Sequence, residues 1–126
     1  MGQASTCGGD ERLKLLHDAG VILRAGGNRV YIDAGTSYWM KPATVSGLLK
    51  KVGRDAFDGI SLNVSNFETT ASSATFAADV SHAFGETMHF VVDTSRNGNG
   101  PTSDHAWCNP AGRALGERPH TGTGAM

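Results

Sequence analysis

Short apolar runs alternate along the chain with longer amphipathic segments. Three of the runs predict strands over residues 29–33, 59–62 and 89–92. A polar residue stands at the end of each: Asp33, Asn63 and Asp93. Their equal spacing of about 30 residues is the length of one βα unit, in which the strands run parallel. Because the carboxyl ends of parallel strands meet at one edge of a sheet, these polar residues predict a site at that edge.

The amphipathic segments predict three helices, over residues 10–24, 42–52 and 72–84, and glycine follows each within two positions. Their apolar residues recur at helical spacing and should face the sheet. These residues are Leu15, Ala19, Ile22 and Leu23 in the first helix, Val45, Leu48, Leu49 and Val52 in the second, and Phe76, Val80, Ala83 and Phe84 in the third. The order α-β-α-β-α-β predicts an α/β fold.

The length of 126 residues allows one domain at most. A closed (β/α) barrel usually needs roughly 200 residues or more, so we expect either a small open α/β sandwich or a piece of a larger fold. Residues 1–9 are predicted to be a disordered start, 10–116 the domain and 117–126 an unstructured tail. Residues 94–126 carry no convincing helix or strand period, which predicts a long loop after the last strand that ends in the tail.

Composition excludes several classes of function. The formal net charge is −1 and like charges form no run, so neither nucleic acid nor a membrane is an expected partner. The five histidines lack metal-ligand spacing, and no phosphate loop or nucleophile motif is present. The sequence therefore predicts no metal and no cofactor.

The first residues lack the basic-then-apolar pattern of a secretory signal, so the chain as written would stay in the cytoplasm. Residues 1–6 match the N-myristoylation pattern at Gly2, although starts rich in small residues also match it by chance. Cys7 and Cys108 fit no metal or redox motif. They are either unrelated thiols or, in an oxidising compartment, one long-range disulfide.

Five polar residues near the strand ends are candidates for chemistry or binding, and each has a structural alternative. Asp33 and Asp93 could act in acid–base catalysis or cap turns. Asn63 and Asn66 could bind sugar hydroxyls or hold their own loop. Arg96 could orient a carboxylate or a hydroxyl, or be a surface charge.

Two tryptophans point more directly to a carbohydrate. Trp39, beside Tyr38, and Trp107 lie in predicted loops and outside the apolar stripes. A tryptophan in a loop offers a flat apolar face on which a sugar ring can stack. The alternative is an aromatic anchor for the loop.

Four segments in this order resemble glycoside hydrolase family 6, the cellobiohydrolases and endo-β-1,4-glucanases that act on cellulose. The segments are VYIDAG at 30–35 with Trp39 following, LNVSNF at 62–67, FVVDTSRNGNGP at 90–101, and WCNP at 107–110 followed by GRALG at 112–116. The resemblance spans residues 10–122. It implies a partial (β/α) barrel, about three βα units of the family's distorted TIM-like barrel, with β-1,4-glucan as the partner.

The resemblance also implies roles for single residues. Asp33 resembles a supporting carboxylate on the leaving-group side, Trp39 the platform of an acceptor subsite, and Trp107 a platform on the donor side. The residues that resemble lining or supporting positions are Asn63, Asn66, Asp93 and Arg96. The family inverts the anomeric centre, using one acid and a base-activated water.

The chain departs from the family pattern in several places. The general-acid Asp of an Arg-Asp-Cys type loop and a later Lys-x-Pro-Gly-Glu-x-Asp-Gly motif have no counterparts, and Thr36 replaces the usual His. The resemblance implies cysteine partners for Cys7 upstream and Cys108 downstream, and neither partner is present. It also implies secretion, which is typical of the family.

These departures leave three hypotheses for a cellulase fragment that is inactive alone. It is a catalytically dead remnant, one half of a split enzyme whose complementing chain carries the missing strands, or a non-catalytic glucan-binding module.

Overall fold

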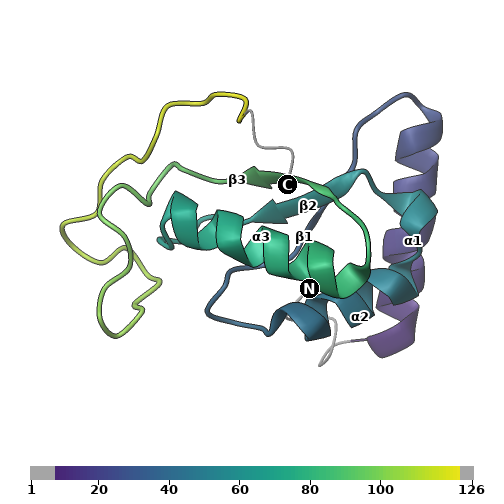
Figure 1. The fold of residues 1–126 in the computed structure, drawn as a ribbon, viewed down its shortest axis with the longest axis horizontal. Helices are drawn as coiled ribbons and strands as arrows, with labels where there is room; N and C mark the ends of the chain where they lie inside the picture. Colours follow the sequence, from purple (N-terminus) through teal and green to yellow (C-terminus); the bar gives the residue numbers. More distant parts are fainter. Residues whose placement is uncertain (1–7, 123–126) are drawn as a thin grey trace.

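Three parallel strands form the centre of the structure, a computed structural model that describes residues 8–122. They are β1 (Tyr31–Asp33), β2 (Gly59–Leu62) and β3 (His89–Val92), paired in the order β1-β2-β3. The helices are α1 (Gly9–Ala25), α2 (Pro42–Val52), the 3-10 helix η2 (Arg54–Ala56) and α3 (Thr70–Phe84). The predicted alternation of helices and strands is confirmed, with the short η2 added before β2 (Figure 1).

Strand β1 begins at Tyr31, later than the predicted start at 29, because Asp58 takes over the pairing of Val30. The Val30 N–H donates to the Asp58 carboxylate at 2.9 Å, and the Asp58 N–H donates to the Val30 carbonyl at 2.7 Å. Asp58 is only 8% exposed and also pairs with Arg24 and Arg29. The hydrogen bond from Val30, reinforced by the two arginines, holds the pKa of Asp58 below its ordinary value of 3.8.

The inward faces predicted for α2 and α3 are confirmed. Their buried residues are Val45, Leu49 and Val52 of α2 and Phe76 and Val80 of α3, with Leu48, Ala83 and Phe84 half-buried. The two helices pack against each other and form the core with β2 residues such as Ile60 and Leu62. Helix α3 begins before the predicted start at 72, because the Thr69 hydroxyl accepts a hydrogen bond from the Ser72 N–H at 3.1 Å and caps it.

The face predicted for the first helix is wrong. Leu15, Ile22 and Leu23 are 62%, 71% and 50% exposed, and Ala19 is exposed as well. Helix α1 instead lies against η2 through Gly20, where the missing side chain permits close contact with the Ala56 carbonyl. The buried side of α1 is formed by Leu13 and Gly20, with Leu16 partly buried, so the backbone contact at Gly20 sets which side faces inward. No helix within residues 8–122 is both long and apolar enough to cross a membrane.

The segment after β3 has no helix or strand up to residue 122, as predicted, yet its backbone is tied back on itself. The Gly98 N–H donates to the Ala114 carbonyl at 3.0 Å, and the Gly116 N–H donates to the Thr94 carbonyl at 2.8 Å. The Thr94 hydroxyl also donates to the carbonyl of Glu117 at 2.8 Å. Ordered contacts therefore reach the first residue of the predicted tail.

The other predicted boundary also shifts. Gly9, which was expected in the disordered start, is the first residue of α1. Residues 1–7 and 123–126 lie outside the described residues, and so do the predictions for Gly2 and Cys7. Cys108 is exposed and forms no disulfide within residues 8–122.

Replacing Gly20 by alanine is expected to separate α1 from η2. The new methyl group would overlap the Ala56 carbonyl oxygen, and such overpacking costs about 1–3 kcal/mol in the free energy of unfolding. Gly47→Ala is the matched control, because Gly47 is also helical, and its new methyl group would meet nothing within 4 Å. In urea denaturation, Gly20→Ala should unfold at a lower urea concentration than the parent. The free energy of unfolding of Gly47→Ala should instead rise by roughly 0.5–1 kcal/mol. An equal rise in the free energy of unfolding in both variants would contradict the close contact between Gly20 and the Ala56 carbonyl.

Candidate functional site

The polar residues predicted at the strand ends lie on three loops at one end of the sheet. These rim loops are residues 34–41 after β1, 63–69 after β2 and 93–122 after β3. Figure 1 shows them at the end of the sheet away from α1. This is the edge at which parallel α/β sheets generally bind ligands, so the rim is the first place to look for a site.

Asn63 is fully buried and joins two of the rim loops. Its amide nitrogen donates to the carbonyls of Glu68 at 3.0 Å and Asp93 at 2.9 Å, and its amide oxygen accepts from the Glu68 N–H at 3.0 Å. Its backbone has a φ of 62°, a left-handed conformation that asparagine tolerates better than most residues. The structure thus supports the alternative in which Asn63 holds the loops, and it leaves the side chain no surface for direct sugar contact.

Asp93 is fixed by the loop that precedes it and by its own turn. Its two carboxylate oxygens accept hydrogen bonds from the N–H groups of Ser65 and Ser95, each at 2.8 Å. Partial burial would raise the pKa of Asp93, but these hydrogen bonds and the nearby Arg96 outweigh it and hold the pKa below 3.8. The lowered pKa favours the ionised carboxylate, a state that suits a base or a supporting charge.

Arg96 lies near Asp93 and packs over the ring of Phe67. Its guanidinium carbon is 4.3 Å from the ring centroid. Its guanidinium donates to the Ser65 carbonyl and, at 3.1 Å, to the side chain of Asn109. Asn66 donates to the Val64 carbonyl at 3.4 Å and stays half-exposed. The arginine is thus a tie between loops and not an isolated surface charge.

Asp33 lies at the end of β1, in the remaining part of the rim. Its carboxylate is exposed and accepts a hydrogen bond from the Gly35 N–H at 2.8 Å. This contact is the turn cap that the sequence offered as the alternative to catalysis. A capped carboxylate can still support a neighbouring site through its charge.

The two tryptophans project from the rim with most of their surface open. Trp39 is 55% exposed and Trp107 is 72% exposed. Trp39 packs over Gly35, where an added side-chain carbon would lie 3.1 Å from the indole ring. It lines a small cleft together with Asn66, whereas Trp107 is not among the lining residues. The structure therefore brings Trp39 and Asn66 together and leaves Trp107 on the outer part of the third loop.

Glu68, His105 and Thr36 also line this cleft and were not predicted as site residues. Glu68 and His105 approach at 3.0 Å across 37 positions of sequence, so no local pattern could identify them. Thr36 is buried, and its hydroxyl has no hydrogen-bond partner among the described residues. Its only sequence signal was its place in a motif where the family resemblance implies histidine.

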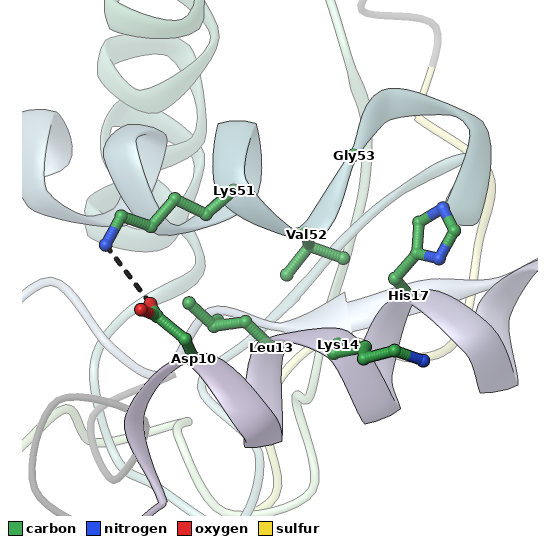
Figure 2. Close-up of a pocket in the computed structure, with 7 residues that line it drawn as sticks. All are labelled: Asp10, Leu13, Lys14, His17, Lys51, Val52 and Gly53. Carbon is green, nitrogen blue, oxygen red and sulfur yellow. Dashed lines mark hydrogen bonds and ion pairs between the residues drawn. The ribbon is translucent and has the colours of Figure 1, made fainter.

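Another hollow lies away from the rim, between α1 and the end of α2, with a volume of about 570 Å³ (Figure 2). Its charged groups are paired: Lys51 lies 3.4 Å from Asp10, and His17 contacts Asp18. That hydrogen bond to Asp18, with a weaker one to Asp55, raises the pKa of His17 above 6.5. No rim residue lines this hollow, and no cluster within residues 8–122 could hold a metal ion, so the rim remains the candidate site.

Comparison with known proteins agrees with this geometry. The family model described as Glycosyl hydrolases family 6 matches residues 3–126. The chain belongs to this family. The resemblance that the four sequence segments indicated is therefore confirmed.

Family-6 endoglucanases are among its relatives. Endoglucanase A of Cellulomonas fimi is 45% identical over 120 residues, which are 94% of this chain and 26% of that protein. Endoglucanase 1 of Streptomyces halstedii is 43% identical over 122 residues, 92% of this chain and 37% of that protein. The endoglucanase Cel6 from Mycobacterium tuberculosis, solved with a thio-linked cellobioside, matches 98% of this chain and 44% of its own with a TM-score of 0.87 and 40% identity. The chain thus spans less than half the length of these relatives.

Asp93 is expected to make folding stability depend on acid. Because its pKa is lowered in the folded state, its contribution is present above pH 3.8 and is lost as the pH falls through the folded-state value. At pH 7, Asp93→Asn should have a lower midpoint temperature of thermal unfolding than the parent. The difference between the two midpoint temperatures should become smaller towards pH 3. Asp79→Asn is the control, because Asp79 is exposed on α3 and its carboxylate has no hydrogen-bond partner within residues 8–122. A difference in midpoint temperature that stays constant with pH would contradict this role of the Asp93 carboxylate.

Proposed function

We propose that the rim of this chain binds β-1,4-glucan as part of a family-6 cellulase, and that these 126 residues do not hydrolyse it alone. The observation that carries the proposal is the pair of exposed tryptophans on loops whose polar side chains are held by hydrogen bonds. Indole faces on fixed loops bind the apolar faces of sugar rings. The cellobioside in the Mycobacterium tuberculosis relative supports a ligand of this class.

The absence of hydrolysis follows from the carboxylates on the rim. An inverting glycosidase needs a protonated acid at the glycosidic oxygen and a base for water, roughly 6.5–9.5 Å apart. Asp93 is kept ionised by its hydrogen bonds, and Asp33 caps a turn as the supporting carboxylate. Neither residue lies in an Arg-Asp-Cys type loop, which in the family carries the acid. The proton donor must then come from residues outside these 126.

A complementing chain would supply that donor together with further strands. The sheet order β1-β2-β3 leaves the outer edges of β1 and β3 without strand partners among the described residues. Unpaired edges of parallel strands are sites at which further strands add. We infer that the three strands are part of the family's TIM-like barrel, which such a partner would extend.

Binding is tested by isothermal titration of cellohexaose into the full 126-residue chain. Trp39→Ala and Trp107→Ala should each weaken binding by about tenfold or more, because aromatic anchors carry most of the affinity of such sites. Ile22→Ala is the matched control, because Ile22 is 71% exposed but lies on α1, away from the rim. If the parent chain shows no binding, the glucan-binding function is wrong and the remnant hypothesis stands.

Hydrolysis is tested by reducing-sugar release with and without a complementing fragment. The fragment would comprise the segments of Cellulomonas fimi Endoglucanase A that this chain does not match. We expect no release from either piece alone and inverted product from the mixture, with a loss of roughly 10²–10⁴-fold when the acid Asp of the fragment is changed to Asn. Hydrolysis by the 126-residue chain alone would show that one of its own carboxylates serves as the acid.

A further inference from the structure

Each rim loop contributes one side chain to a cluster centred on His105. The ring of Tyr38 stacks on the ring of His105 with centroids 3.8 Å apart and planes within 5°. The Nδ1 of His105 lies 3.0 Å from the Glu68 carboxylate. These three residues, which we call the clasp, therefore connect the loops after β1, β2 and β3.

Glu68 is the fixed member of the clasp. Its backbone N–H and carbonyl are both held by the buried amide of Asn63, and the carbonyl also accepts from Asn97 at 3.1 Å. Its side chain is only 13% exposed. A carboxylate that is fixed in this way gives His105 one defined position.

His105 is held in a turn whose own hydrogen bonds are local. Its N–H donates to the Thr102 carbonyl at 3.0 Å, and the next N–H, of Ala106, donates to the Thr102 hydroxyl at 2.9 Å. The φ of His105 is 51°, an uncommon conformation for a residue other than glycine. Local bonds shape the turn, and the clasp joins it to the other two loops, in addition to the tie that Arg96 makes between Ser65 and Asn109.

Each outer member of the clasp is close in sequence to a tryptophan. Tyr38 immediately precedes Trp39, and His105 lies two residues before Trp107. The turn that bears Trp107 has no helix or strand to fix it. On the side of the segment that precedes Trp107, the contact between Tyr38 and His105 links it to Trp39, and on the side that follows, Arg96 holds Asn109.

We propose that Tyr38, Glu68 and His105 are positioning residues that make Trp39 and Trp107 act as one bivalent site, selective for long glucans over short ones. This rests on the proposed function, in which both tryptophans bind sugar. When one ligand spans two subsites, the second contact forms at an effective concentration set by how firmly the subsites are held together. Loosening the clasp lowers that concentration and leaves each separate platform intact.

The first test needs no sugar. The chain has two tryptophans, so Trp39→Phe leaves Trp107 as the only one. In that background His105→Ala should lower the fluorescence anisotropy of Trp107 and increase its quenching by acrylamide. His120→Ala is the matched control, because His120 is an exposed histidine of the same segment whose polar side-chain contacts within residues 8–122 are with Arg118 and Glu117. If the anisotropy of Trp107 is unchanged in His105→Ala, the clasp does not hold Trp107 and the proposal is overturned.

The second test compares ligand lengths by NMR titration of the full chain. His105→Ala and Tyr38→Ala should weaken binding of cellohexaose by about tenfold and change cellobiose binding by less than about twofold. Glu68→Gln should retain most of the affinity, because an amide oxygen can still accept a hydrogen bond from His105. If the variants lose affinity equally for cellohexaose and cellobiose, or lose affinity for neither, the proposed bivalent site is overturned. If the parent binds neither sugar, the proposed function fails as well, and the anisotropy still reports separately whether the clasp holds Trp107.

Discussion

The buried side chain of Asn63 is the contact on which the rest of the rim depends, because it joins the loop after β2 to the start of the loop after β3. Its amide fixes both backbone groups of Glu68 and the carbonyl of Asp93. An amide that is 0% exposed must have its donors and acceptor satisfied, and here the neighbouring loops satisfy them. The positions of Asp93, and through Glu68 of His105, follow from this one side chain.

The order of elements and the inner faces of α2 and α3 were predictable because they depend on periodic burial against a sheet. The buried face of α1 could not be predicted, because it depends on Gly20 meeting the Ala56 carbonyl. The start of β1 was mispredicted for a similar reason. Its first ladder position is taken by the Asp58 side chain, and a pattern of apolar residues does not encode such a contact.

The rim residues show the same division. The place of Asp33, Asn63 and Asp93 at the strand ends could be inferred from their spacing alone. Whether each side chain binds a ligand or holds a loop could not, because Asn63 was equally compatible with both until its burial was known. The contact of Glu68 with His105 left no sequence signal, since it joins two loops that only the fold brings together.

In the proposed function, glucan binding and hydrolysis depend on different contacts. The ties that position the tryptophan loops, from Asn63, Arg96 and the clasp, all lie within the described residues. Protonation of a glycosidic oxygen instead needs a carboxylic acid with a raised pKa, and the hydrogen bonds that order Asp93 keep its pKa low. The hydrogen bonds that order Asp93 therefore favour its ionised form, and in the proposed function the acid is a carboxyl group held in a different environment.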